Sequence, residues 1–490
     1  KGLFLMRYNL RHCVTGLLPA LALVCLLFMP ACQQAPSTDA VWRQVPEILA
    51  EIKPPVFPDQ DFLITDFGGL ANGETDNTEA IAKAIEACTN AGGGRVVVPE
   101  GVFLTGAIHL KSNVNLHISK NATLLFSTNT DKYLPVVFTR FEGTECYNYS
   151  APIYAYEQEN IAVTGSGVLD GQASTTAWWP WKGRQEYGWQ EGEPRQQPDV
   201  NALVQMAEDN VPVEQRVFGK GHYLRPNFIQ FYKCQNILID SVTIKRSPMW
   251  EIHPVLCENV TVQNITVTSH GPNNDGCNPE SSKNVLIQNC FFDTGDDCIA
   301  IKSGRNADGR RLNVPSENIV IRNCIMRDGH GGVVIGSEMS GGCRNVFAED
   351  CVMDSPNLER ALRIKTNSVR GGYVENIYMR NITVGQVSDA VIRIFFHYQE
   401  GDVGEFTPYV RNVYVENVTS QKSKYGLLLD GYERSPISNV NLINCSFENV
   451  AEGNVLNHVE DLTTHNFSVN GQELSATDLG ATAGDDNSAN

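Results

Sequence analysis

Four short polar phrases in the middle of the chain concentrate acids, a histidine and a basic pair. They are Asn273-Asn-Asp275-Gly276, Gly295-Asp296-Asp297, Gly329-His330-Gly331 and Arg363-Ile-Lys365. Acids that lie close together cannot all ionise freely, so the pKa of at least one should rise. A protonated acid beside ionised carboxylates suits the hydrolysis of a glycosidic bond, in which one group protonates the leaving oxygen and another deprotonates water. The basic pair would then bind the carboxylate of a uronic-acid sugar.

A sequence repeat indicates how the fold brings these phrases together. The repeat is an Asn followed by a β-branched residue and an alternating stretch, and its leading residues are Asn236, Asn259, Asn284, Asn318, Asn345, Asn376, Asn412 and Asn439. Five places after each of them stands a second polar residue, most often another Asn. The alternation has period two and is rich in Val, Ile, Thr and Tyr, which predicts strands. Short strands that return to one register without a helical crossover predict an all-β fold, the parallel β-helix.

The register of the repeat stacks the acids. Asp296 lies 12 residues after its leading Asn, and His330 lies 12 after the next, so we expect them on neighbouring coils about 4.8 Å apart. Asp275 lies 16 residues after its leading Asn, and a four-residue bulge at 269–272 would return it to the same column. Arg363 and Lys365 are two residues apart on a strand and should face the same side.

Each phrase alone has a structural explanation. An isolated Asp296-Asp297 pair would more often cap a turn, and an isolated His330 would more often be structural. Their occurrence on successive coils beside a basic pair favours a site. Lys302 has two interpretations: it extends the positive part of the site, or it belongs to a solvated face.

The four phrases and their order resemble the polygalacturonases of glycoside hydrolase family 28, over about residues 61–450. The resemblance implies a right-handed parallel β-helix that hydrolyses pectic galacturonan with inversion. It implies Asp296 as general acid, Asp275 and Asp297 as the groups that activate water, and His330 as support for the acid. It also implies substrate binding by Asn273, Arg363, Lys365 and Tyr432, the last being the tyrosine expected after the basic motif. No metal and no cofactor is expected.

The position of cleavage depends on an insertion at about 172–224, which interrupts the repeat. If the insertion closes one end of the cleft, cleavage is terminal; if both ends are open, cleavage is internal. The insertion and the phrase Arg225-Pro-Asn favour the exo-acting branch, with endo-polygalacturonase or rhamnogalacturonan hydrolase as alternatives. Two other classes remain: a pectate lyase whose acids bind Ca²⁺, and a β-helix adhesin, which would need no stacked acids.

The ends of the chain predict export and a single catalytic domain. Arg7 and Arg11 precede an apolar run at 14–30, which predicts a signal peptide over residues 1–31. The phrase ending in Cys32 resembles a bacterial lipoprotein signal, so we expect a lipid-anchored periplasmic or outer-membrane protein, with plain secretion as the alternative. Residues 32–60 are predicted to be a linker, 61–474 the β-helix with an N-terminal capping helix after Asp76, and 475–490 a disordered tail.

Charge and cysteine content narrow the partners. The formal net charge of −18 should repel nucleic acid, and we expect a monomer that binds a pectic polysaccharide or oligogalacturonide. Eleven cysteines follow the predicted signal, an odd number without a CxxC pair. We therefore expect most of them to be core-filling thiols.

Overall fold

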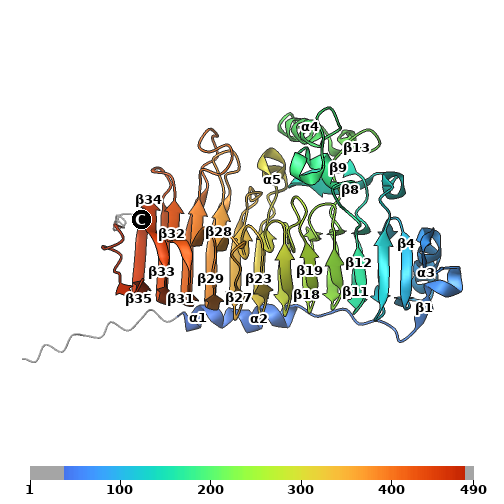
Figure 1. Cartoon of the computed structure of the whole chain (residues 1–490), viewed down its shortest axis with the longest axis horizontal. Coiled ribbons are helices and arrows are strands. Elements are labelled where there is room, and N and C mark those ends of the chain that lie inside the picture. The colour runs from blue at the N-terminus through green and yellow to red at the C-terminus, as the bar shows by residue number, and fades with distance from the viewer. Residues whose placement is uncertain (1–37, 481–490) are drawn as a thin grey trace, which may run out of the picture. The chain divides into compact units, whose positions relative to one another are not determined.

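The computed structural model describes residues 38–480, which form a right-handed parallel β-helix (Figure 1). Its largest sheet has 23 strands. In its N-terminal part these are β1 (Asp61–Leu63), β2 (Asn72–Asp76), β3 (Gly94–Val98), β4 (Gly101–Thr105), β6 (Val114–Ile118), β7 (Ala122–Phe126), β11 (Glu159–Gly165) and β12 (Val168–Asp170). In the middle they are β15 (Gln235–Asp240), β16 (Thr243–Lys245), β18 (Glu258–Gln263), β19 (Thr266–Ser269), β20 (Lys283–Gln288), β21 (Phe291–Thr294), β23 (Ser316–Arg322) and β24 (Ile325–Met326). The last are β26 (Cys343–Glu349), β27 (Val352–Met353), β29 (Tyr373–Val384), β31 (Tyr409–Ser420), β33 (Ile437–Phe447), β35 (Val459–Val469) and β36 (Gln472–Glu473).

Two smaller parallel sheets form the face that carries the polar phrases. One has four strands, β5 (Ile108–His109), β10 (Ile153–Tyr156), β14 (Ile229–Tyr232) and β17 (Ile252–Val255). The other has six, β22 (Ile299–Ile301), β25 (Val333–Ile335), β28 (Arg360–Lys365), β30 (Ala390–Phe395), β32 (Ser423–Asp430) and β34 (Val450–Asn457). Cys277 bridges them by pairing with Ile252 and Ile299, so the two sheets continue one another along the coil axis.

The Asn repeat forms the predicted ladder at a corner of the coil. The leading Asn residues have φ between 52° and 60°, a left-handed conformation that Asn tolerates better than most residues. From Asn259 to Asn439, each side-chain amide donates a hydrogen bond of 2.7–3.3 Å to the Asn one coil earlier. These bonds make the register repeat from coil to coil, and the apolar residues between them fill the interior.

Helix α3 (Thr78–Asn90) is the predicted capping helix at the N-terminal end of the coil (Figure 1). The backbone amide of Thr78, its first residue, donates a hydrogen bond of 2.9 Å to the side-chain carboxylate of Asp76. Its buried residues belong to the coil interior and are Ala80, Ile81, Ala84, Ile85 and Cys88. All eleven cysteines within residues 38–480 are buried and free, which confirms their interpretation as core-filling thiols.

The segment predicted to be a linker differs from that prediction. It contains α1 (Asp39–Trp42) and α2 (Gln44–Glu51), which lie along the outside of the large sheet (Figure 1). Trp42, Val45 and Ile48 pack against Val320 and Phe347 of that sheet. The apolar spacing in this short segment is helical, and the linker prediction overlooked it. Ala476 and Leu479 likewise pack on the coil end, so the predicted tail at 475–490 begins with packed residues; residues 481–490 lie outside the described range.

A cap outside the coil repeat lies over the N-terminal half of the face that carries the polar phrases (Figure 1). It contains the three-stranded sheet of β8 (Val137–Phe141), β9 (Thr144–Asn148) and β13 (Val217–Phe218), together with α4 (Gln197–Glu208). Helix α5 (Asn306–Leu312) contacts both α4 and β9. Residues 172–224, predicted as a loop insertion, supply α4 and β13. Within residues 38–480 no helix has the length and apolar character to span a bilayer.

Candidate active site

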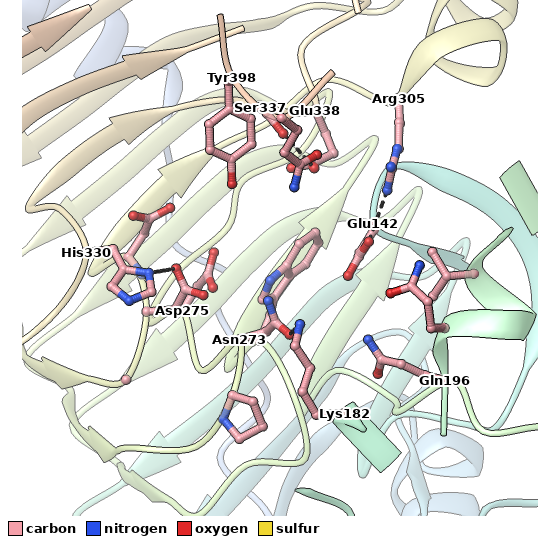
Figure 2. Close-up of a pocket in the computed structure, with 18 of the residues that line it drawn as sticks. Glu142, Lys182, Gln196, Asn273, Asp275, Arg305, His330, Ser337, Glu338 and Tyr398 are labelled. Carbon is pink, nitrogen blue, oxygen red and sulfur yellow. Dashed lines mark hydrogen bonds and ion pairs between the residues drawn. The ribbon is translucent and has the colours of Figure 1, made fainter. Parts of the chain in front are cut away.

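One cleft of about 800 Å³ brings the four polar phrases together. Asp275, Asp296, Asp297 and His330 line it, and Figure 2 shows Asp275 beside His330. Residues from the cap, among them Glu142, form the side away from His330. Asp296 and Asp297 stand just before β22, and Asp275 stands just before Cys277, which pairs with Ile299 of that strand. The acids are therefore held by the coil itself rather than by a free loop.

Asp296 and His330 stack on neighbouring coils, as their equal distance from the ladder predicts. Ile299 pairs with Val333, which sets this register, and the His330 backbone amide donates to the Asp296 carbonyl at 3.0 Å. Their side chains also meet, with His330 Nδ1 2.8 Å from Asp296 Oδ1. This hydrogen bond raises the pKa of His330 to about 9. Although burial opposes the shift, the same bond lowers the pKa of Asp296 below its usual range.

Asp275 lies one register position away from the predicted column. Cys277 pairs with Ile299, and this register sets Asp275 opposite Asp297 rather than Asp296. The chain takes eight residues from Ser269 to Cys277 and five over the matching stretch of the next coil. The bulge is therefore three residues long, not four.

Asp275 is the acid of the set that retains a proton. It is 2% exposed, and Asn278 donates a hydrogen bond of 2.7 Å to its Oδ2. Burial, followed by the nearby charge of Asp296, raises the pKa of Asp275 to about 8. Because the charge of Asp296 acts on Asp275, the two carboxyls titrate as a pair. With the pKa of one raised and that of the other lowered, the pair holds one proton at neutral pH.

Asp297 is held ionised by the basic pair. Lys365 Nζ lies 2.7 Å from its Oδ2 and Arg363 Nη1 lies 3.1 Å from its Oδ1, so the two cations do face the same side of β28. Although burial opposes it, Lys365 and then Arg363 lower the pKa of Asp297. The ring of Tyr398 lies against both cations, 5.4 and 5.8 Å from its centroid.

Lys302 lines the cleft, but its charge is matched by protein acids. Its Nζ lies 3.2 Å from Glu338 and 3.6 Å from Asp275, and it sits 4.5 Å from the centre of the Trp250 ring. Its side chain is 3% exposed, which contradicts the solvated-face alternative. The contact with Asp275 stabilises the ionised form of that acid and opposes the effect of burial.

Asn273 stands beside Asp275 and is the point where the cap meets the coil. Its Oδ1 accepts hydrogen bonds from Lys182 Nζ at 2.6 Å and from Arg225 Nη2 at 2.9 Å. Figure 2 shows Asn273 and the tip of Lys182 on the side of Asp275 away from His330.

The structure does not bring Tyr432 into the cleft. The residue is 3% exposed; its hydroxyl donates to the Phe396 carbonyl at 2.6 Å and accepts from the Ser368 amide at 3.1 Å. Tyr398, which is one coil earlier, lines the cleft in its place. Tyr432 was predicted because it follows the basic motif along the chain. Tyr398 follows that motif as well, and order alone does not distinguish two tyrosines on successive coils.

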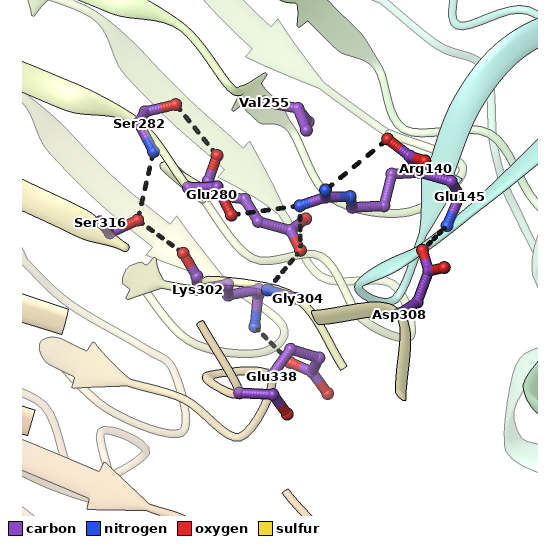
Figure 3. A network of polar contacts seen from close by, with 12 residues as sticks. Arg140, Glu145, Val255, Glu280, Ser282, Lys302, Gly304, Asp308, Ser316 and Glu338 are labelled. Atoms are coloured by element: carbon purple, nitrogen blue, oxygen red, sulfur yellow. Dashed lines mark hydrogen bonds and ion pairs between the residues drawn. The ribbon is translucent and has the colours of Figure 1, made fainter. Parts of the chain in front are cut away.

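A buried ionic network fastens the cap to the coil that carries the acids (Figure 3). Arg140 of β8 lies 3.1 Å from Glu280, which also accepts from the Gly304 amide at 3.0 Å just beyond Lys302. Arg216 pairs with Asp308 of α5 at 2.8 Å. Because removing one member of a buried pair leaves its partner's charge uncompensated, this network fixes the position of the cap over the cleft.

Comparison with known proteins identifies the family. The model of glycosyl hydrolases family 28 matches residues 218–468, more than half of the chain. The chain belongs to this family. A probable polygalacturonase from Vitis vinifera is 33% identical over 333 residues, covering 66% of this chain and 60% of that relative. An exo-poly-alpha-D-galacturonosidase from Dickeya chrysanthemi is 29% identical, covering 74% of this chain and 62% of that relative. The chain thus spans about 60% of the length of these two relatives.

Among solved structures, a hyperthermoactive exopolygalacturonase from Thermotoga maritima is 50% identical, with a TM-score of 0.86. The match covers 88% of this chain and 96% of that one. The family 28 match includes all four polar phrases and leaves out Glu142 and Lys182 of the cap. Sequence reasoning also missed these two residues, because neither belongs to the repeat. The position of the insertion was the only signal for Lys182, and Glu142, which precedes the insertion, had none.

Proposed function

We propose that this family 28 hydrolase is an exo-polygalacturonase, which cleaves α-1,4 galacturonosyl linkages of polygalacturonic acid from a chain end with inversion. The observation that carries the proposal is the cleft in which an acid pair sharing one proton lies beside an ionised Asp297 and the basic pair Arg363 and Lys365. The acids match hydrolysis of a glycosidic bond, and the basic pair matches a uronate carboxylate.

The cap supports action at a chain end. It lines one side of the cleft with Glu142, Gln196 and Val200. Internal cleavage needs a cleft that is open at both ends, so that the polymer can continue past the site in both directions, and the cap stands in one of these directions. The structural similarity to an exopolygalacturonase at 50% identity supports the same mode.

Each acid has a proposed role. Asp296 protonates the leaving oxygen, drawing on the proton that the pair with Asp275 holds, and His330 fixes its carboxyl through the 2.8 Å hydrogen bond. Asp297 is ionised and, with Asp275 after its proton has moved, deprotonates the attacking water. Arg363 and Lys365 bind a galacturonate carboxylate, and Tyr398 replaces Tyr432 as the aromatic side chain beside them.

A Ca²⁺-dependent lyase is disfavoured by the same geometry. Asp296, Asp297 and His330 are close enough to form a candidate metal-binding group, but Arg363 and Lys365 already contact both oxygens of Asp297. Two protein cations at this carboxylate repel a divalent cation.

The test is a time course on polygalacturonic acid that follows reducing ends, chromatographed products and absorbance near 235 nm (about the maximum expected for an unsaturated uronate). The protein should release galacturonate alone from the earliest times, and Asp296→Asn should lower kcat by about a hundredfold to ten-thousandfold. A ladder of oligomers would instead establish endo action. Rising absorbance that a chelator abolishes would establish a lyase.

We also propose export as a lipid-anchored protein that acts as a monomer. Support for the anchor comes from the signal-like residues 1–31 and Cys32, which lie outside the described residues. Metabolic labelling with a fatty acid should mark the full chain and not its Cys32→Ser variant; an unlabelled chain found in the medium would indicate plain secretion. Sedimentation of the detergent-solubilised protein should give one chain per particle.

A further inference from the structure

Two cations on the cap side of the cleft converge on one neutral atom. Lys182 and Arg225 both donate to Oδ1 of Asn273. The remaining hydrogen bonds of Arg225 go to Gln196 Oε1 at 2.9 Å and to the carbonyls of Pro248 and Pro272, each at 2.7 Å. All of these acceptors are uncharged.

Within residues 38–480, neither cation forms a salt bridge. Arg225 is nonetheless fully buried, and burial lowers its pKa to about 10. Burial and the neighbouring Arg225 also lower the pKa of Lys182. A buried charge without a salt-bridge partner is costly, and the half-buried Lys182 beside Arg225 adds repulsion between like charges. Glu142 and Asp296 offset this only in part, from beyond salt-bridge distance. The coil and the cap hold the two cations in place although this arrangement costs stability.

Lys182, with the buried Arg225 behind it, faces the cleft on the opposite side of the acids from the basic pair. Lys182 lines the cleft, next to Asn273 and Gln196 (Figure 2), whereas Arg363 and Lys365 contact Asp297. The scissile bond would therefore lie between two positive groups. Only the group at Lys182 lies at the end that the cap closes.

We propose that Lys182, supported by Arg225 and Asn273, forms a second carboxylate-binding subsite that takes the uronate group of the terminal sugar. This inference rests on the proposed exo-polygalacturonase function and adds its specificity determinant. Lys182 Nζ has two donors left after its bond to Asn273, and a sugar carboxylate there would supply the missing counter-charge. The subsite would make the enzyme select an acidic sugar at the chain end and reject a neutral one.

The test compares D-galacturonate with D-galactose, which carries a neutral CH₂OH in place of the carboxylate. Binding is measured by calorimetry in an Arg363→Gln background, so that the other basic group contributes less. Galacturonate should bind more tightly than galactose, and adding Lys182→Met should remove a preference of about ten- to a hundredfold, the strength of a hydrogen bond between charged groups. The matched control is Lys220→Met, a cap residue whose exposed side chain pairs with Asp131.

The same variants are then tested for hydrolysis of trigalacturonate in the otherwise unaltered protein. Lys182→Met should raise KM and lower kcat/KM by about ten- to a hundredfold, while Lys220→Met should match the unaltered protein. The temperature of unfolding should not fall in Lys182→Met, because the side chain forms a single hydrogen bond. An unchanged sugar preference would overturn the subsite even if the protein hydrolyses trigalacturonate. A protein that hydrolyses no galacturonan but loses the preference in Lys182→Met would overturn the proposed function and keep the subsite.

Discussion

The cap network and the cleft are both rich in buried charge, but they arrange it differently. In the network, Arg140 meets Glu280, and Arg216 meets Asp308, so each cation has an acid within contact distance. In the cleft, Asp275 keeps a proton and Lys182 has no acid partner in the described part of the chain. From this difference we infer that fully paired charges hold one element against another, whereas incompletely paired charges remain able to bind a charged substrate.

Breaking the network should have the largest effect, on stability. Arg140→Met should lower the free energy of unfolding by about 3–5 kcal/mol, because it leaves the buried carboxylate of Glu280 without its arginine. The measurement is equilibrium unfolding in urea followed by far-UV circular dichroism. Activity per folded molecule should stay near that of the unaltered protein, since Arg140 does not line the cleft.

The matched change in the cleft is Lys182→Met, which removes a cation that has no acid partner among residues 38–480. If the two variants lost equal stability, the contrast between the paired and unpaired regions would be contradicted. If Arg140→Met abolished activity while leaving stability intact, the network would have a catalytic role instead.

How much of this was predictable from sequence depends on periodicity. The ladder was predictable because the same Asn, with the same φ, repeats at each coil; it fixed the stacking of Asp296 and His330. Asp275 was displaced by one position because a bulge has no periodic signal. Arg140 and Lys182 lie on elements outside the repeat, and their partners Glu280 and Asn273 lie far away in sequence, so only the fold could reveal these contacts. Tyr398 and Tyr432 show the same limit, because order along the chain does not tell which of the two faces the cleft.

Changing a charge within the cleft should shift the pH at which activity declines, and not only change stability. Lys302 lies 3.6 Å from Asp275 and favours its ionised form, so Lys302→Met should raise the pKa of Asp275 further above 8. The alkaline decline of kcat/KM should then move to higher pH by about one unit, measured on trigalacturonate. Lys283→Met, at an exposed pair with Glu317, should leave the decline in place. A decline that does not move would assign the essential proton to Asp296 and His330 alone.

The free energy of unfolding of the unaltered protein should depend on pH through the same groups, in a direction that their pKa shifts determine. The pKa values of Asp275 and His330 are raised, from 3.8 to about 8 and from 6.5 to about 9, so the folded state binds more protons than the unfolded state. Their contribution to the free energy of unfolding is complete at a pH below the ordinary pKa of each group, and it is lost as the pH rises through about 8 for Asp275 and about 9 for His330. Asp297 behaves oppositely: its lowered pKa contributes stability at neutral pH that is lost on acidification below about 4.

The smallest effect should come from an ion pair with good geometry and little burial. Arg344 and Glu317 lie on neighbouring strands, β26 and β23, with a shortest nitrogen–oxygen distance of 2.6 Å, and the Arg344 side chain is 44% exposed. This contact is shorter than the 3.1 Å between Arg140 and Glu280. Arg344→Met should nevertheless lower the free energy of unfolding by only about 0.2–1 kcal/mol, because water solvates either charge when the pair is broken. Urea unfolding of the two variants side by side separates distance from burial. A loss at Arg344 as large as that at Arg140 would mean that contact distance sets the cost, and burial could then no longer explain why the cap is fastened by its network.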